Sequence, residues 1–300
     1  MSIRAETFMN KPMHYSFMHG AGNIFCVIDN RDQQLSVDEL SAFIVSGLPI
    51  DWHVDGLIAL CDSDTYDMEV DFLNPDGSHG AMCGNGARCA VKFYVQHFLN
   101  PIPHYGDVSF SMAGTEYEAE FVDFGNHVTI YFPETQSITP ITLPNALEAF
   151  YIENGADHVV IDAMQYVSNE REFEEFDLHS FAKPIRHAEQ FPRGANVNLV
   201  FPKEGNRLRI RTFERGVERE TAACGTGALA VGFAYASKSG QNGLSGGPYM
   251  YPIEIEVCSG EILLIHSKKR IDSISLSGPA EFLTEQEAYE LFLMNQKRMQ

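Results

Sequence analysis

Short apolar stretches separated by turn residues recur along the chain, in an order that is nearly the same in its two halves. In the first half, alternating or continuous apolar segments predict strands at residues 13–17, 25–28, 57–61, 68–73, 108–112, 116–124 and 127–132. In the second half, similar segments predict strands at residues 149–152, 158–161, 197–201, 208–213, 253–257, 262–265 and 271–276. Each half has a helix pattern between its fourth and fifth strands, which predicts two homologous α+β domains related by an approximate twofold.

Local signals mark the remaining segments. The capping boxes Ser36–Glu39 and Thr284–Glu287 predict the starts of two further helices. Residues 173–183 are expected to form a short helix that Pro184 ends. The other segments are expected to lack regular structure, as a loose tail at 1–12, a Pro/Thr-rich linker at 133–144 and a flexible loop at 240–247.

The two repeated helices begin with the same motif. Residues 83–87 and 224–228 both read Cys-Gly-x-Gly-Ala, and each sequence leads directly into its helix pattern. The first helix is expected to end before Asn100-Pro101. We therefore expect the fold to bring Cys83 and Cys224 to opposite sides of one small ligand in a cleft between the domains.

Composition and charge limit the classes of function that the sequence could have. The formal charge is −20, from 21 basic and 41 acidic residues, which argues against a nucleic-acid or anionic-membrane surface. No run of about 18 apolar residues predicts a membrane-spanning helix, and residues 1–11 lack the apolar core of a signal peptide. Six cysteines in 300 residues are too few for a disulfide scaffold. We therefore expect a cytoplasmic protein with reduced thiols.

Metal and common cofactor motifs are missing from the sequence. It has neither a Cys-x₂-Cys pair nor His-Glu-x-x-His, so zinc is not expected. Gly20-x-Gly22 lacks the third glycine and the helix of a dinucleotide loop. No lysine-centred pyridoxal phosphate signature is evident, and we expect no cofactor.

A cysteine at a helix N-terminus is suited to proton transfer. The unpaired N–H groups and the helix dipole favour the thiolate and lower the thiol pKa towards neutrality. The glycines that follow allow a ligand carboxylate to approach those N–H groups. Two such cysteines on opposite faces of an amino-acid Cα can remove the proton on one side and return it on the other. The motif pair therefore predicts a cofactor-independent stereoinversion.

Packing offers a different interpretation of each motif. A single cysteine at a small-residue helix start is more often a buried packing residue, and a disulfide between the motifs is another alternative. Duplication at corresponding positions argues against packing alone, and a reducing compartment argues against the disulfide. Cys89 is expected to pack within its helix, and Cys26, Cys61 and Cys258 to lie in the core.

Four longer motifs carry a resemblance to a known family. They are His19–Phe25, the Asn74–Ser78 turn with Met82–Cys89, Phe191–Asn198, and Phe213–Gly227. Together they resemble the diaminopimelate epimerases, which are cofactor-independent two-cysteine enzymes, and the similarity spans most of the chain. The resemblance implies an α+β fold of two pseudo-symmetric α/β domains, each a mixed or antiparallel sheet wrapped around a central helix. We expect an N-terminal domain of residues 1–133 plus 279–300 and a C-terminal domain of residues 134–278.

The resemblance also implies roles for individual residues. Cys83 and Cys224 would be the acid/base pair. Backbone N–H groups would hold the reacting carboxylate, at Gly84, Asn85, Gly225 and Thr226. Substrate contacts would come from Asn23, Asn74 and Asn196, while Glu214 would fix the α-amino group. Arg215 would pair with the distal carboxylate.

His158 is implied to lie near the catalytic pair, although a packed strand histidine is an equal alternative. Arg88 is expected at the helix surface or in an interdomain pair. The implied reaction converts LL-2,6-diaminopimelate to the meso form for lysine and peptidoglycan precursors, in a cytoplasmic homodimer.

Two segments depart from the family pattern. The family usually has Gly-Ile-Gly-Ala-Asp-Gly where this chain has residues 51–56, Asp-Trp-His-Val-Asp-Gly. It usually has Asn-Pro-His, with the Asn on the distal end of the substrate, where this chain has Ala156-Asp157-His158. The alternatives are therefore a racemase or epimerase of another amino acid on the same fold, histidine for example, and a non-catalytic amino-acid-binding protein.

Overall fold

The computed structural model describes residues 4–8, 11–32, 35–132, 138–144, 147–238, 251–267 and 274–298. The chain forms two compact units. Residues 1–131 and 277–298 belong to the first unit, and residues 132–276 belong to the second. The chain therefore leaves the first unit, builds the second and returns to the first.

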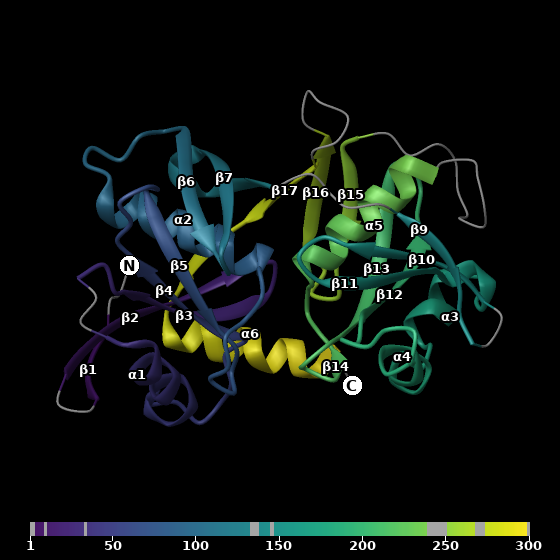
Figure 1. Ribbon diagram of the computed structural model, residues 1–300, viewed down its shortest axis with the longest axis horizontal. Coiled ribbons are helices and arrows are strands. Elements are labelled where there is room, and N and C mark those ends of the chain that lie inside the picture. Colours follow the sequence, from purple (N-terminus) through teal and green to yellow (C-terminus); the bar gives the residue numbers. More distant parts are fainter. Residues whose placement is uncertain are drawn as a thin grey trace. The chain divides into compact units, whose positions relative to one another are not determined.

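The first unit contains a curved sheet and three helices (Figure 1). Its strands are β1 (Arg4–Phe8), β2 (Lys11–Gly20), β3 (Asn23–Asp29), β4 (Gly56–Cys61), β5 (Met68–Leu73), β6 (Gly106–Met112), β7 (Thr115–Val122), β8 (His127–Tyr131) and β18 (Glu281–Leu283). Its helices are α1 (Val37–Ala42), which continues as a wide turn over Phe43–Gly47, α2 (Gly84–Phe98) and α6 (Glu285–Arg298), and a 3-10 turn spans Asp123–Gly125. Both predicted capping boxes are present, at Ser36–Glu39 and Thr284–Glu287.

The second unit is built from the same kinds of element. Its strands are β9 (Thr139–Thr142), β10 (Glu148–Glu153), β11 (Asp157–Asp162), β12 (Asn196–Pro202), β13 (Arg207–Glu214), β14 (Arg219–Glu220), β15 (Ile253–Glu256) and β16 (Ile262–Ser267). Its helices are α3 (Glu170–Glu174), α4 (Leu178–Arg186) and α5 (Gly225–Lys238), and a 3-10 turn spans Ala163–Gln165. The chain passes back to the first unit within β17 (Ile274–Pro279).

Strand pairing repeats between the units, which confirms the predicted duplication. In the first unit, β3 and β4 are parallel, β4 and β5 antiparallel, and β5 and β6 parallel, with α2 between the last two in the sequence. In the second, β11 and β12 are parallel, β12 and β13 antiparallel, and β13 and β15 parallel, with α5 between the last two. Each cysteine motif thus begins the helix that crosses between corresponding parallel strands.

Each sheet curves around its cysteine-motif helix. Helix α2 contacts β2, β3, β4, β5, β7 and β8, and it is buried on all sides over its first ten residues. Helix α5 contacts β10, β11, β12, β15 and β16 in the same way (Figure 1). A helix that is enclosed on all sides has no solvent-exposed face, so its sequence need not include a polar face. This explains the run of small and apolar residues in both helices. The predicted fold class, with a sheet wrapped around a central helix in each unit, is confirmed.

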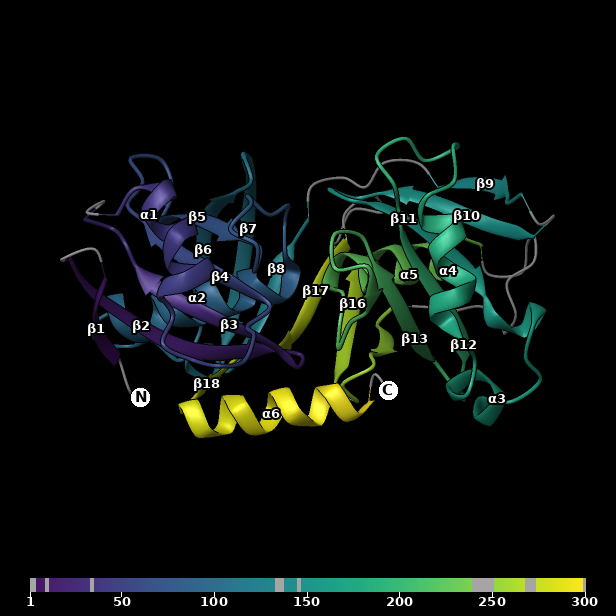
Figure 2. The same ribbon diagram turned by 90° about the horizontal axis from the view of Figure 1, so that it is seen from below.

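Shorter helices cover the other face of each sheet. In the first unit, residues from α1, α6, β2, β3 and β4 form one core around Tyr15, Phe43 and Trp52. In the second, α4 lies alongside β12 and β13 (Figure 2), and its Leu178 packs with Phe173 and Phe213. Each central sheet is therefore buried on both faces, which fixes the positions of the strand ends that carry the candidate site.

Three local predictions were wrong. The expected tail contains β1, which pairs antiparallel with β2 and so forms a strand despite its polar composition. The expected linker contains β9, which pairs with β10. The single helix expected at 173–183 is two helices, because Asp177 caps α4, and Pro184 lies inside α4 rather than ending it. The expected loop at 240–247 and the residues 271–273 lie outside the described residues.

Candidate active site

Cys83 occupies the N-cap of α2. Its backbone is extended (φ −115°, ψ 102°), and its Sγ accepts a hydrogen bond from the Gly86 N–H at 3.4 Å. The side chain is partly exposed. The sulfur therefore lies at the positive end of a helix dipole, which interacts favourably with negative charge.

A series of buried polar side chains, joined by hydrogen bonds, includes residues of the first cysteine motif. Asn85 Nδ2 donates to Asn23 Oδ1 at 2.6 Å, and Asn85 Oδ1 accepts from Arg88 Nη2 at 2.9 Å. Arg88 Nη1 also donates to Gly84 O at 3.2 Å, and Nε to Pro279 O at 3.4 Å. Arg88 is fully buried, so the prediction of a helix-surface position was wrong. The structure thus brings the expected residues Asn23, Gly84 and Asn85 together and adds Arg88.

The hairpin turn between β2 and β3 contacts the same motif. A Cβ added to Gly20 would lie 2.5 Å from Asn85 O, too close for any side chain.

Asn74 lies in the turn after β5, where its Nδ2 donates to Ser78 Oγ at 3.0 Å. The predicted turn at 74–78 is therefore present, and Asn74 helps to close it.

Cys224 stands at the corresponding place before α5. Its carbonyl accepts the first helical hydrogen bond, from Ala228 N at 2.9 Å, and its Sγ lies 3.6 Å from Thr226 Oγ1. The side chain is buried. Asn154 Nδ2 donates to Thr226 O at 2.8 Å and ties the β10–β11 turn to this motif. Gly225 and Thr226 form the first turn of α5, so their N–H groups belong to the helix N-terminus.

Arg215 is held by a second polar cluster at the ends of β11, β12 and β13. Its Nη1 donates to Asp157 Oδ2 at 3.2 Å, and its backbone N–H donates to Asn196 Oδ1 at 2.8 Å. Asn196 Nδ2 in turn donates to Asp157 O at 3.2 Å. Within the described part of the chain, the Arg215 Nε and Nη2 have no protein partner. That edge of the guanidinium has the bidentate donor geometry that binds a carboxylate. Glu214 precedes Arg215 at the end of β13 and is partly exposed.

Asp157 is the centre of this cluster. Besides Arg215, its carboxylate accepts from Arg193 Nη2 and Nε, at 2.8 and 3.1 Å, and from the Tyr151 hydroxyl. Burial would raise the pKa of Asp157, but the hydrogen bonds from Arg193 and Tyr151 and the two guanidinium charges outweigh it and lower the pKa. Asp157 is therefore ionised at neutral pH, and Arg215 carries a fixed counter-ion.

His158 follows Asp157 on β11 and is completely buried. Desolvation lowers its pKa to about 3; the Asp157 charge opposes this shift and the Arg215 charge adds to it. The imidazole is therefore neutral throughout the physiological range and does not serve as a cationic partner.

His158 makes stability depend on pH. Below about pH 6.5 the unfolded chain binds a proton at this histidine that the folded chain does not, so stability falls as the pH falls towards 3. We expect a loss of about 2 kcal/mol between pH 7 and pH 5 from this residue alone. Urea unfolding of wild type and His158→Gln at both pH values measures it, because all other groups are common to the two proteins. Equal pH dependence in the two would contradict the burial of a neutral His158.

The other four cysteines are unsuited to proton transfer. Burial raises the pKa of Cys61 and Cys89 to about 12 and of Cys258 to about 11, and it raises that of Cys26 further. Cys26 and Cys61 lie in the core as expected, whereas Cys258 is partly exposed. All six cysteines are present as thiols in this structure.

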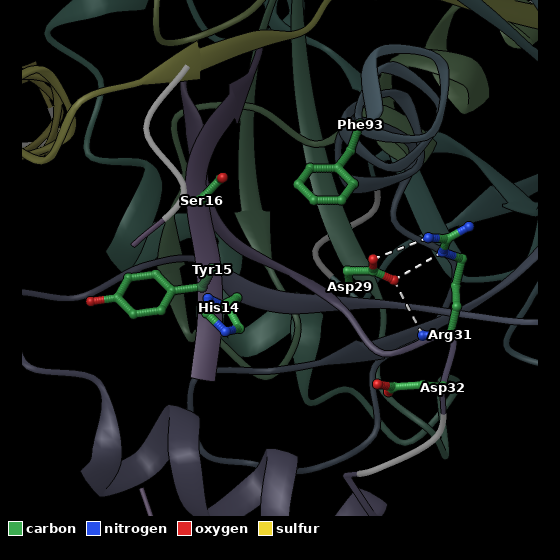
Figure 3. Close-up of a pocket in the computed structure, with 7 residues that line it drawn as sticks. All are labelled: His14, Tyr15, Ser16, Asp29, Arg31, Asp32 and Phe93. Carbon is green, nitrogen blue, oxygen red and sulfur yellow. Dashed lines mark hydrogen bonds and ion pairs between the residues drawn. The ribbon is translucent and has the colours of Figure 1, made fainter. Parts of the chain in front are cut away.

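A separate pocket in the first unit contains none of the expected site residues. It has a volume of about 410 Å³ and is lined by residues of β2, the end of β3 and the turn after it, and α2 (Figure 3). Asp29 and Arg31 form an ion pair on its wall, at 2.9 Å. The pocket lies towards the opposite end of β2 from Gly20, which contacts the motif, and so is distinct from the candidate site.

The described ranges contain neither a metal-binding cluster nor a helix suited to a membrane. No three His, Cys, Asp or Glu side chains there lie close enough together to hold a metal ion. Among the described helices, none combines the length and apolar character that crossing a bilayer requires.

Comparison with known proteins decides the family. The sequence model of the diaminopimelate epimerase family matches residues 15–135 and 150–283, which include both cysteine motifs. The chain belongs to the diaminopimelate epimerase family. The resemblance that the four motifs carry is thereby confirmed.

Individual members of the diaminopimelate epimerase family align over nearly the whole chain. The diaminopimelate epimerase of Chlorobaculum tepidum is 35% identical over 266 residues, which cover 88% of this chain and 96% of that protein. The diaminopimelate epimerase of Aquifex aeolicus is 30% identical over 287 residues, which cover 89% and 94%.

Solved structures share the fold at low sequence identity. A phenazine biosynthesis protein of the PhzF family from Bacillus anthracis has a TM-score of 0.67 and 13% identity, over 90% of this chain and 97% of that chain. A hydroxyproline epimerase from Agrobacterium vitis, with bound trans-4-hydroxy-L-proline, has a TM-score of 0.59 and 14% identity, over 91% of each chain. At this identity the likeness concerns the fold alone.

Sequence reasoning missed four polar residues in this diaminopimelate epimerase family member. Asp157 and Arg193 organise Arg215, Asn154 ties a turn to α5, and Asn198 contacts His158. One signal for Asn198 was available, since it is an amide in the otherwise apolar run Val197–Phe201. Such a residue has to find hydrogen-bond partners inside the core.

Proposed function

We propose that this protein is a diaminopimelate epimerase that interconverts LL- and meso-2,6-diaminopimelate by proton transfer at Cα. The observation that supports this most directly is the pair of cysteines at the N-termini of two enclosed helices, in a chain of this family. The reaction would serve lysine and peptidoglycan precursor synthesis. The family resemblance also supports a cytoplasmic location and a homodimer, and sedimentation of the purified protein would test the dimer.

In the proposed mechanism, each unit contributes one of the two cysteines that transfer protons. One cysteine acts as a thiolate base on one face of Cα, while the other delivers a proton from the opposite face, and the roles are reversed in the back reaction. The Cα proton is a very weak acid, so negative charge that develops on the reacting carboxylate has to be stabilised. The N–H groups at Gly84, Asn85, Gly225 and Thr226 are proposed to do this as two helix N-termini.

The distal end of the substrate is proposed to bind Arg215. Its Nε/Nη2 edge, which has no partner among the described residues, suits a carboxylate, and Asp157 and Asn196 hold the residue in place. Asn23, Asn74 and Asn196 are proposed to contact the substrate, and Glu214 to accept a hydrogen bond from the α-ammonium group. A substrate with carboxylates at both ends would use both sets of groups.

Exchange of the substrate Cα proton with deuterium from the solvent tests the proposed function. The reduced protein is incubated with LL-diaminopimelate in D₂O, and the Cα proton signal is followed by NMR together with the appearance of the meso isomer. We expect loss of the Cα signal with formation of meso product, and no change after both motif thiols have been alkylated. Absence of exchange with diaminopimelate would overturn the proposed substrate.

Arg215 provides a second prediction. Arg215→Met removes a charged hydrogen-bond pair worth about 1.5–3 kcal/mol, so KM for diaminopimelate is expected to rise about 10- to 100-fold with a smaller change in kcat. Steady-state kinetics measure the split. Arg171→Met, which removes an exposed arginine from α3, is the matched control and should leave KM unchanged. An unaltered KM in Arg215→Met would show that Arg215 does not bind substrate.

A racemase or epimerase of another amino acid is the second candidate. One observation favours it: Asp157 neutralises part of the Arg215 charge, and Ala156 has no side-chain amide to help bind a distal carboxylate. The same deuterium assay across other amino acids, histidine included, distinguishes the two candidates. A non-catalytic binding protein would exchange no Cα proton in any amino acid that it binds.

A further inference from the structure

Asn198 makes a complete set of hydrogen bonds inside the second unit. The residue lies on β12 and is fully buried. Its Nδ2 donates to Val159 O at 3.1 Å and lies 3.2 Å from His158 Nδ1, while its Oδ1 accepts from Thr212 Oγ1 at 3.0 Å. Both amide protons and the carbonyl therefore have partners, which leaves this side chain one orientation.

That orientation determines the tautomer of His158. A backbone carbonyl can only accept, so the amide group that faces Val159 O has to be the NH₂. The second proton of the same NH₂ then points to His158 Nδ1, which has to present its lone pair. A neutral imidazole that accepts at Nδ1 carries its proton on Nε2. The desolvation that lowers the pKa of His158 to about 3 keeps the ring neutral.

The proton on His158 Nε2 has no acceptor in the described part of the chain. The nitrogen is buried and makes no hydrogen bond there. A buried donor without a partner is rare in folded proteins and calls for an explanation such as a bound ligand. In the described ranges, the buried atoms Asn154 Oδ1 and Thr221 Oγ1 of the second unit likewise make no hydrogen bond.

These groups surround the first turn of α5. A Cβ added to Gly227 would lie 2.5 Å from Asn198 Oδ1 and 3.2 Å from Cys224 Sγ, so the Asn198 amide and the Cys224 sulfur both contact this glycine. Asn154 donates to Thr226 O in the same turn, and Thr221 precedes Cys224 by three residues. His158, through Asn198, and Asn154 are therefore connected to the helix turn that follows Cys224.

We propose that Asn198 is a positioning residue that fixes His158 as the neutral Nε2–H tautomer, so that His158 is a hydrogen-bond donor to the amino-acid ligand at the first turn of α5. His158 in this role carries no proton between substrate and solvent. Gly227 is required because any side chain there would displace the Asn198 amide. The ligand part of this proposal rests on the proposed function, whereas the tautomer does not.

Nitrogen NMR of the full-length protein tests the tautomer without reference to activity. With ¹⁵N-histidine labelling, the signals of His158 are assigned as those that His158→Gln removes. We expect a protonated Nε2 and an unprotonated Nδ1, unchanged between pH 5 and pH 9. A protonated Nδ1, or titration within that range, would overturn the proposal.

Substitution of Asn198 tests its role. In Asn198→Asp a carboxylate replaces the NH₂ donor, so His158 is expected to switch to the Nδ1–H tautomer and kcat/KM to fall about 100-fold, the usual cost of one lost donor. Asn30→Asp is the matched control, since Asn30 is also buried and bonds both polar groups of Leu35. It should change neither the tautomer nor kcat/KM. If Asn198→Asp does not fold, Asn198→Ala is used, and a mixture of tautomers is expected.

The outcomes separate this proposal from the proposed function. A tautomer switch with full epimerase activity would overturn the donor role of His158 and leave the epimerase assignment intact. A wild-type protein that exchanges no Cα proton but shows the Nε2–H tautomer would overturn the function and leave the Asn198–His158 pair established. An unchanged tautomer in both Asn198 variants would overturn the positioning role.

Discussion

Cys83→Ser and Cys224→Ser are each expected to lose epimerisation by about 10²- to 10⁴-fold, the range that a general acid or base contributes. A serine hydroxyl has nearly the size of the thiol but does not ionise near neutral pH. Because each face of Cα requires its own proton carrier, loss of either cysteine should stop inversion in both directions. The rate of conversion between LL- and meso-diaminopimelate measures this for each variant.

The matched control is Cys258→Ser. Cys258 is partly exposed, and burial raises its pKa to about 11, so it is not available as a base at neutral pH. Its replacement should leave the rate unchanged. Near-normal turnover in either Cys83→Ser or Cys224→Ser would exclude a mechanism with two bases.

Arg88→Met is expected to reduce both stability and catalysis. The guanidinium is fully buried, and its removal leaves Asn85 Oδ1 without the Arg88 donor and takes the side-chain donor from Gly84 O. Leaving a buried acceptor without its donor typically costs about 1–3 kcal/mol of unfolding free energy. Without Arg88 the Asn85–Asn23 pair also loses its orientation, so kcat/KM should fall by about 100-fold in the fraction that remains folded.

Lys92→Met separates these two effects. Lys92 lies one turn further along α2, is also buried, and donates to Asn126 Oδ1 at 2.6 Å. Its loss should lower stability in urea unfolding but leave kcat/KM unchanged, since it does not contact the cysteine motif. Arg88→Lys keeps the charge but not the fork of donors, and should recover stability more than activity. Wild-type kcat/KM in Arg88→Met would show that this series of buried polar side chains does not organise the site.

Local patterns were sufficient to predict most of the framework. The alternation of Met68, Val70 and Phe72 identified β5, and the Ser36 and Thr284 capping boxes identified the starts of α1 and α6. Each of these signals depends only on residues that are close together in the sequence, so it can be recognised without knowledge of the fold. The motif helices were predictable for the same reason, because small residues follow each cysteine.

Two strands with polar or Pro/Thr-rich sequences were not predictable, because their own residues lack the apolar pattern of a strand. The polar segment Arg4–Phe8 forms a strand because β2 supplies its hydrogen bonds, and Thr139–Thr142 does so because of β10. The buried polar networks were not predictable for a different reason, since they join residues that are far apart in the sequence. The partner of Arg88 at Pro279 is 191 residues away, and Asp157 and Arg215 are 58 residues apart. The roles of the expected site residues remain predictions, which the substitutions above test.

The return of the chain to the first unit has a consequence for how the protein is made. Residues 277–298 complete the first unit: Arg88 donates to Pro279 O, and Asn295 donates to Gly22 O at 2.8 Å, beside Asn23. During synthesis the second unit leaves the ribosome whole before these residues appear, and domains generally begin to fold as they emerge. The scaffold around Cys83 therefore becomes complete last, although Cys83 is translated long before Cys224. A chain released before residue 277 would contain every residue of the second unit but lack those that complete the first.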